Sequence, residues 1–152
     1  MRLEDAIKSN KFRDEKHKAS LNVLYTAYWL KSNFTQVFKA CGLTMEQHNV
    51  LRILKGMHPE PMCVKEIGAR ILEKNSNVPR IIDRLVAKKL VKRAQSKQDK
   101  RETMISLTEK GIEVIDHARK EIDTYANSLI NMNEDDARSL NELLEKMRSN
   151  EE

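Results

Sequence analysis

The spacing of apolar residues predicts a mainly helical chain that begins with one long helix. Over residues 18–40 one apolar stripe contains Leu21, Leu24, Tyr25 and Tyr28, and another contains Val23, Ala27, Leu30, Phe34, Val37 and Phe38. A helix with apolar residues on more than one face is buried on more than one side. We therefore expect one side to pack on its own domain and the other on a partner chain.

The middle of the chain predicts short helices followed by a two-stranded hairpin. Thr44 and Gln47 form a capping-box pattern that opens a helix ending before Pro59. A second helix is expected over residues 64–72, and a third is expected to be capped by Ser76 with Pro79 at its third position, where a proline is tolerated. Strands are expected at 90–95 and 103–107, around a polar tip at 96–101. Two short helices joined by a tight turn and followed by such a hairpin are typical of a winged helix-turn-helix.

The C-terminal part predicts two more helices with a narrow apolar seam. Its residues are Ile115, Ala118, Ile122, Tyr125, Leu129 and Met132, then Ala137, Leu140, Leu144 and Met147. Such spacing is typical of a coiled-coil-like contact. Together with the two-faced first helix, it predicts a homodimer. The expected fold is mainly α with a small β wing, divided into dimerisation helices at 1–40, a DNA-binding lobe at 41–111 and further dimerisation helices at 112–152.

Composition restricts the setting of the protein. The chain has 152 residues, 39% of them hydrophobic, and no run of 18 apolar residues, so no membrane span is expected. The charged N-terminus lacks the apolar core of a signal peptide. The two cysteines, Cys41 and Cys63, suit a reducing compartment better than a disulfide scaffold. We therefore expect a cytoplasmic protein without a cofactor.

Positive charge is concentrated in one segment. Residues 74–101 contain ten lysines or arginines and two acids, an excess of +8, whereas the whole chain carries only +5 and the other 124 residues therefore carry −3. A basic block on a slightly acidic chain indicates a polyanion partner, here double-stranded DNA. The alternative interpretation of the basic block is an ordinary solvated surface without a polyanion partner.

Three motifs occur in order along this region. One is Asp99-x-Arg101, five residues, then Leu107-Thr108-x-x-Gly111. The others are the recognition-helix segment 76–85 and the wing entry 90–93. Together they resemble the MarR family of transcriptional regulators, most strongly through the first motif. The resemblance covers about residues 20–148 and implies a homodimer that binds a palindromic operator, usually represses, and often releases DNA when it binds a small aromatic anion or when a thiol is oxidised. Lys89 departs from the pattern, because the family usually has glycine there, so the turn is expected to be strained or built differently.

The recognition helix supplies the first group of candidate DNA contacts. Asn77, Arg80 and Arg84 share one outward face at i, i+3 and i+7, with Ser76 at the start of the helix. Arginine suits guanine edges and asparagine suits adenine edges, while either can also reach phosphates. A solvated helix face is the alternative interpretation.

The wing tip supplies the second group. Arg101 can enter a narrow, negatively charged minor groove. Asp99 would brace this arginine or the wing through a charge-assisted hydrogen bond. Lys97 and Lys100 are expected to touch phosphate, which positions the protein without reading sequence. The alternative for Asp99 and Arg101 is a plain surface ion pair.

The sequence signals for a ligand, redox or metal site are weaker than those for DNA binding. Tyr25, Tyr28, Trp29 and Phe38 could line a pocket for an aromatic ligand, although core or interface packing is the alternative. Cys63 lies at a helix start beside Lys65, where a thiolate is favoured, so a redox-sensing regulator is an alternative to a buried, inert thiol. His48, His58, Glu60 and Cys63 match no tight metal-ligand spacing, so no metal site is expected.

Two other function classes are alternatives to a DNA-binding regulator. A winged helix can also serve as a protein–protein interaction module, but the basic block and Arg101 favour DNA. The sequence has no glycine-rich phosphate loop and no nucleophile–base set. We therefore expect a protein that is not an enzyme.

Overall fold

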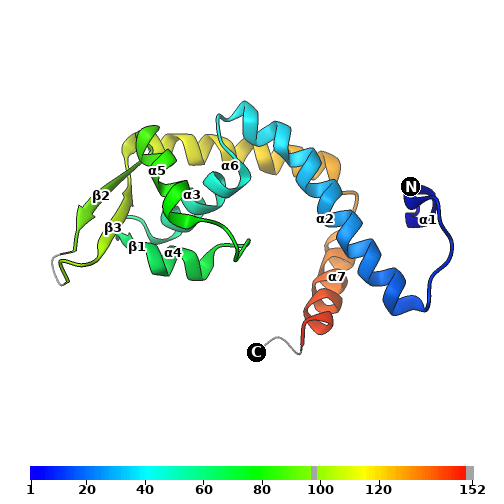
Figure 1. The fold of residues 1–152 in the computed structure, drawn as a ribbon. Coiled ribbons are helices and arrows are strands. Elements are labelled where there is room, and N and C mark those ends of the chain that lie inside the picture. Colours follow the sequence, from blue (N-terminus) through cyan, green and yellow to red (C-terminus); the bar gives the residue numbers. More distant parts are fainter. Residues whose placement is uncertain (97–98, 150–152) are drawn as a thin grey trace. The chain divides into compact units, whose positions relative to one another are not determined.

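The computed structural model describes residues 1–96 and 99–149 (Figure 1). The chain forms two compact units, Met1–Ile122 and Asp123–Glu152. The elements are α1 (Leu3–Ile7), α2 (Glu15–Ala40), α3 (Met45–Met57), β1 (Met62–Cys63), α4 (Val64–Arg70), α5 (Val78–Ala87), β2 (Val91–Gln95), β3 (Thr103–Leu107), α6 (Glu109–Leu129) and α7 (Glu134–Met147). The predicted mainly α fold with a small β wing is therefore confirmed. The functional division at residues 40 and 111 stays a prediction.

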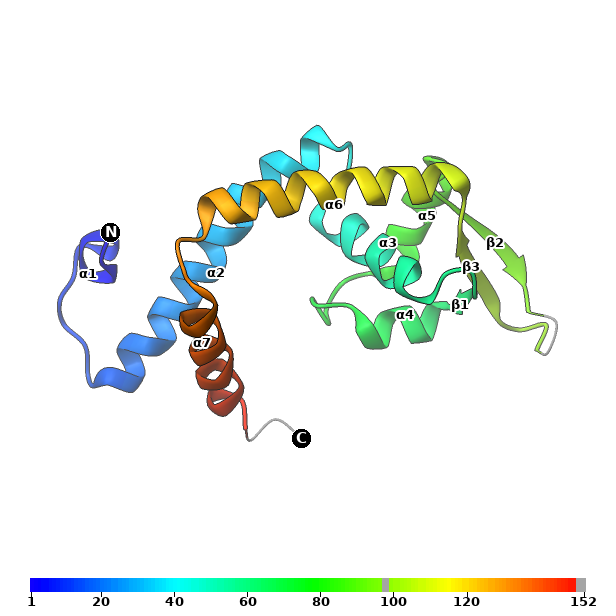
Figure 2. The same cartoon turned by 180° about the vertical axis from the view of Figure 1, so that it is seen from behind.

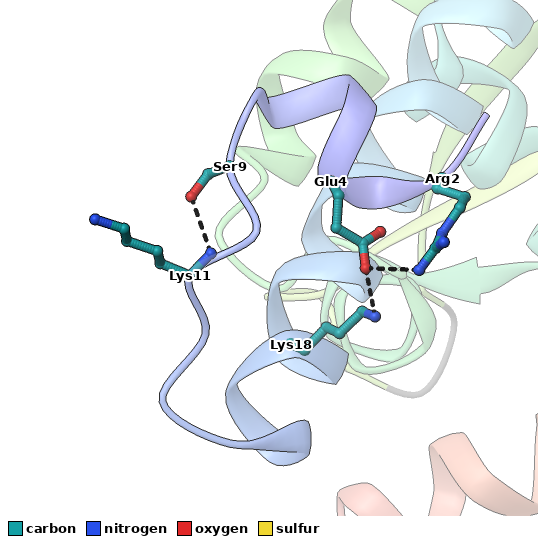
Figure 3. A network of polar contacts seen from close by, with 5 residues as sticks. All are labelled: Arg2, Glu4, Ser9, Lys11 and Lys18. Atoms are coloured by element: carbon teal, nitrogen blue, oxygen red, sulfur yellow. Dashed lines mark hydrogen bonds and ion pairs between the residues drawn. The ribbon is translucent and has the colours of Figure 1, made fainter.

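The N-terminal segment folds back on the start of α2 through a charged contact (Figure 3). The Glu4 carboxylate lies 2.6 Å from the Lys18 ammonium and 3.2 Å from the Arg2 guanidinium. The hydrogen bond from Lys18 is the main reason that the pKa of Glu4 falls to about 2. Asp14 caps α2 by accepting the His17 backbone N–H at 2.7 Å, so the helix begins three residues before the predicted start.

The end of α2 is a Schellman turn closed by glycine. The Leu43 N–H donates to the Phe38 carbonyl at 2.9 Å, and the Gly42 N–H donates to the Lys39 carbonyl at 2.9 Å. Gly42 has φ 69°, a left-handed conformation that glycine adopts without a side-chain clash. Phe38 and Leu43 are both buried, so the turn also anchors α2 to the core.

The lobe that follows packs three helices on a three-stranded antiparallel sheet of order β1-β3-β2 (Figures 1 and 2). Met62 pairs with Ile105, and Val91 pairs with Leu107, which fixes both outer strands against β3. The Thr44–Gln47 capping box at the start of α3 is present as predicted. One continuous core contains Val50, Leu51, Leu54, Met62, Ile67, Ile82, Leu85, Leu90 and Ile105.

The first residues of the predicted apolar seam on α6 are covered by the lobe itself. Ile115 and Ala118 are buried and belong to the core of the lobe rather than to a free seam. In the second unit, α7 is capped by Asn133, whose Oδ1 accepts the Asp136 N–H at 2.8 Å. Leu143, on α7, is 65% exposed. No helix in the described part of the chain is long and apolar enough to cross a membrane.

Candidate nucleic-acid interface

Helix α5, the predicted recognition helix, begins one residue later than predicted. Asn77, not Ser76, is its N-cap, and its side-chain oxygen accepts the Arg80 backbone N–H at 3.1 Å. Pro79 therefore occupies the second helical position rather than the third. Both serine and asparagine are good caps, so composition alone did not decide between them. The carboxamide oxygen of Asn77 is thus engaged in capping the helix.

The two faces of α5 differ as the spacing predicted. Val78, Ile82 and Leu85 are buried in the core, whereas Arg80 and Arg84 are exposed. In the part of the chain that the structure describes, neither guanidinium has an ion-pair partner. Beside them is a hollow of about 370 Å³. Its lining residues are Thr44, Glu46, Gln47, Glu73, Ser76, Asn77, Arg80, Ile81 and Arg84.

Other cations of the basic block are engaged inside the lobe. The Lys88 ammonium lies 2.6 Å from the Gly42 carbonyl oxygen and 2.9 Å from the side-chain oxygen of buried Gln47. Arg93, on β2, forms an ion pair with Asp83 on α5. These cations join elements of the lobe to each other. The positive charge that remains available to a polyanion is therefore more localised than the +8 total suggests.

The wing tip is shaped by its own backbone contacts. Asp99 Oδ1 accepts the Arg101 backbone N–H at 2.9 Å, and the Glu102 N–H donates to the Asp99 carbonyl at 2.9 Å. The side chain of Gln95 donates to the Lys100 carbonyl at 2.8 Å. Asp99, Lys100 and Arg101 are all exposed. Asp99 thus braces the turn through the Arg101 backbone, which is the second of its two predicted roles. Lys97 lies outside the described residues.

At the base of the wing, unlike at its tip, close contacts hold the start of α6 against the strand entry. The Thr108 hydroxyl donates to the Lys89 carbonyl at 2.8 Å and accepts the Gly111 N–H at 3.0 Å. A Cβ added at Gly111 would lie 2.0 Å from the Leu90 carbonyl oxygen. Only glycine therefore allows α6 to start this close to the strand entry.

The aromatic residues predicted to line a ligand pocket do not share one environment. Phe38 is buried, and its ring centroid lies 5.0 Å from that of His48, whose pKa is lowered mainly by burial. Tyr28 is 71% exposed, and Trp29 is also exposed, while Tyr25 is half-buried. Their role in ligand binding stays a prediction.

Cys63 is buried at the junction of β1 and α4. Its backbone N–H donates to the Glu66 carboxylate at 2.8 Å, and this hydrogen bond is the main reason that the pKa of Glu66 is lowered. Its redox role also stays a prediction. Among the described residues, no group of three or more histidine, cysteine or acidic side chains could hold a metal ion.

Local sequence patterns did not reveal the polar contacts that hold the segment between α4 and α5. The Lys31 ammonium on α2 lies 2.6 Å from the Glu73 carboxylate, across 42 positions of sequence. The side-chain oxygen of buried Asn49, on α3, accepts the Leu72 N–H at 3.0 Å. The polar residue Asn49 among the apolar positions of α3 is a sequence signal for the second contact, whereas local spacing gives none for the first.

Comparisons with known proteins agree with this geometry. Residues 32–118 match the family described as the transcriptional regulator SarA/Rot. The chain belongs to the SarA/Rot family of transcriptional regulators. This SarA/Rot regulator is 25% identical over 130 residues to the HTH-type transcriptional regulator YdgJ of Bacillus subtilis, covering 84% of this chain and 78% of YdgJ. A family of transcriptional regulators agrees with the prediction that the protein is not an enzyme.

Solved structures show the same fold. The DNA complex of MepR from S. aureus has a TM-score of 0.77 at 23% identity, covering 86% of this chain and 96% of MepR. The organohalide-sensing regulator RdhR, in its 2,4-dichlorophenol-bound form, has a TM-score of 0.80 at 19% identity, covering 91% of this chain and 82% of RdhR. A putative MarR-like transcription regulator from Bacillus cereus also has this fold, with a TM-score of 0.79 at 17% identity, covering 91% of this chain and 99% of that protein, so the fold implied by the sequence motifs is confirmed.

Proposed function

We propose that this SarA/Rot regulator binds a palindromic DNA operator as a homodimer and represses transcription until a small ligand releases it. The observation that carries the proposal is the arrangement of three exposed guanidinium groups. Arg80 and Arg84 lie on the outer face of α5, and Arg101 lies on the wing tip. A helix that enters a major groove and a wing that reaches the neighbouring groove need cations at these two places.

The distribution of exposed apolar residues supports the homodimer. On α2, Leu24 is 67% exposed and Tyr28 is 71% exposed, and Val23 and Trp29 are exposed beside them. On α7, Leu140, Leu143 and Met147 are exposed. Apolar residues gathered on two helices are typical of surfaces that a partner covers. A second copy of the chain would bury them and place two recognition helices on one duplex.

A ligand-responsive mechanism is supported by similarity to RdhR, whose structure contains 2,4-dichlorophenol. The aromatic residues of α2 offer apolar contact to a ligand of this class. Tyr28 and Trp29, exposed on a single chain, would contact such a ligand at the dimer interface, whereas buried Phe38 serves the core. We therefore expect a ligand of this class to contact α2 through Tyr28 or Trp29.

Operator binding is tested with duplexes selected from a random pool, followed by fluorescence anisotropy over a range of salt concentrations. The two recognition helices should read half-sites about 10 base pairs apart, one helical turn. Arg84→Ala should weaken operator binding by about 1–3 kcal/mol and relax specificity at one position of each half-site. Binding should weaken steeply with added salt, because phosphate contacts release counterions.

Arg52→Ala is the matched control, because Arg52 is an exposed arginine on α3 outside the α5 face and the wing. It should leave sequence specificity unchanged. Equal losses for Arg84→Ala on all sequences would make Arg84 a phosphate contact. Binding without selectivity or salt dependence would instead favour a protein-interaction module.

A further inference from the structure

An ion pair joins helix α2 to the segment that leads into the recognition helix. The Lys31 ammonium lies 2.6 Å from the Glu73 carboxylate, and the two side chains are 53% and 50% exposed. The hydrogen bond to Glu73 is the main reason that the pKa of Lys31 is raised. Lys31 therefore keeps its positive charge across the neutral pH range. This contact joins α2 to the segment between α4 and α5.

The charge of Lys31 also acts on a second carboxylate, that of Glu46. Glu46, in the first turn of α3, has a lowered pKa, chiefly through its own backbone hydrogen bond, with a smaller contribution from the charge of Lys31. Glu46 and Glu73 both line the hollow beside Arg80 and Arg84. Lys31, Glu46 and Glu73 come from α2, α3 and the segment before α5, respectively.

The segment that contains Glu73 leads directly into the N-cap of α5. The Leu72 N–H donates to Asn49 on α3, and the Ser76 N–H donates to the Glu73 carbonyl at 3.0 Å. Asn77, four residues after Glu73, is the N-cap of α5. The segment is thus held to α3 at its start and to α2 at Glu73. A shift of Glu73 would move the N-terminus of α5, because only three residues separate Glu73 from the cap.

We propose that Lys31 and Glu73 are positioning residues that set the recognition helix relative to α2. The inference rests on the proposed function, in which α2 lies at the dimer interface and two copies of α5 read one operator. The position of α5 relative to α2 then contributes to the distance between the two recognition helices. The ion pair would therefore sharpen the preference of the dimer for one half-site spacing, without touching DNA.

Charge-reversal variants test this proposal. Operator duplexes with the selected spacing, and duplexes lengthened by one base pair between the half-sites, are titrated with Lys31→Glu, Glu73→Lys and the double variant. Each single variant should reduce the preference for the selected spacing by about 1.5- to 5-fold, the range expected from an exposed ion pair. The double variant should recover most of the preference, because the opposite charges face each other again.

Spacing preference separates positioning from simple charge effects. Lys31→Glu lowers the net charge by two and Glu73→Lys raises it by two, so their overall DNA affinities should move in opposite directions. Their spacing preferences should nevertheless fall together. If the two preferences instead moved in opposite directions, charge alone would explain the result and the positioning role would be wrong.

The Lys55–Asp116 ion pair offers a matched control. Its atoms are 2.8 Å apart, it joins α3 to α6, and its side chains are 35% and 51% exposed. Lys55→Glu, Asp116→Lys and their double variant should leave the spacing preference unchanged. Light scattering and thermal unfolding of every variant would show that dimer and fold are intact.

The outcomes distinguish the inference from the function on which it rests. If the unmodified protein binds no operator, the proposed function is wrong and the inference falls with it. If the unmodified protein prefers one spacing and the single variants keep that preference, only the positioning role is wrong. Single variants that lose the preference without recovery in the double variant would also contradict it.

Discussion

The two ends of the wing carry the two halves of one sequence motif, and they differ in almost every physical respect. At the tip, Asp99 and Arg101 are exposed and held by a few hydrogen bonds of the turn. At the base, Leu107 and Gly111 are buried, and Thr108 is bonded to the strand entry. The five residues between Arg101 and Leu107 contain most of β3, Thr103–Leu107. The fixed spacing of the motif therefore reflects the length of β3, which connects the exposed wing tip to the buried base of the wing.

This difference shows that a motif is not a single functional unit. Its second half holds the base of the wing in place, and its first half is exposed at the tip. A substitution at the base should therefore lower the stability of the fold, whereas one at the tip should lower only DNA affinity.

Gly111→Ala should produce the largest effect. The new methyl group would lie 2.0 Å from the Leu90 carbonyl oxygen, which is backbone and cannot rotate away. We expect the free energy of unfolding to fall by about 3 kcal/mol or more, at the upper end of the range for overpacking. Urea unfolding followed by circular dichroism measures this loss.

Gly56→Ala is the matched control for that substitution. Gly56 is a residue of α3, and a Cβ there would meet no atom within 4 Å. Alanine should stabilise the helix by about 0.5–1 kcal/mol through its higher helix propensity. A loss below about 1 kcal/mol in Gly111→Ala would mean that the base of the wing adapts, and the contrast between the two ends would weaken.

Arg101→Ala should change DNA binding while leaving the fold unchanged. We expect operator affinity to fall by about 1–3 kcal/mol if the guanidinium reads a groove. The free energy of unfolding should change by less than about 0.5 kcal/mol, as is usual for an exposed position. Anisotropy titrations and urea unfolding of the same preparation separate the two effects.

Asp99→Ala should weaken operator binding in the same direction, because Asp99 Oδ1 holds the Arg101 backbone. Asp99→Asn is its control, since asparagine keeps the acceptor oxygen and removes only the charge. In a double-mutant cycle the losses from Asp99→Ala and Arg101→Ala should be non-additive. Simple addition of the two losses would show that Asp99 does not place Arg101.

Sequence patterns predicted the features of this fold that depend on neighbouring residues. The Thr44–Gln47 capping box, the strand at 103–107 and the apolar face of α5 need only short spacings to be recognised. The cap of α5 was misplaced by one residue because Ser76 and Asn77 are both good caps. Short spacings thus located the elements but did not decide between neighbouring residues of similar propensity.

Contacts between distant segments could not be predicted in this way. Lys31 and Glu73 are 42 residues apart, and Lys88 is 46 residues from Gly42. No local spacing relates such pairs, so Lys88 counted as one more cation of the basic block. The surface that covers the apolar face of α6 could not be predicted for a similar reason. Periodicity identifies an apolar face but not the surface that packs on it. Ile115 and Ala118 are covered by the lobe itself.

The smallest expected effect concerns Lys89, which connects α5 to the base of the wing. Lys89 has φ 59° in a Schellman turn, where the Leu90 N–H donates to the Leu85 carbonyl at 3.0 Å and the Lys89 N–H donates to the Val86 carbonyl at 2.8 Å. The same turn ends α2, with Gly42 at the corresponding position. The hydrogen bonds are those of a normal turn, so the departure from glycine is accommodated by the Lys89 backbone alone.

Lys89→Gly should therefore stabilise the protein, and Gly42→Ala should destabilise it. A left-handed residue with a side chain costs about 1–2 kcal/mol, and the greater freedom of glycine in the unfolded chain offsets about 0.5–1 kcal/mol of that relief. We expect changes of similar size and opposite sign, a net gain of about 0.5–1 kcal/mol for Lys89→Gly and a loss of about 0.5–1 kcal/mol for Gly42→Ala. Thermal unfolding at high salt, which screens the lost lysine charge, measures both changes. A destabilised Lys89→Gly variant would mean that the lysine side chain itself stabilises the base of the wing, and the support would then depend on more than Thr108 and Gly111.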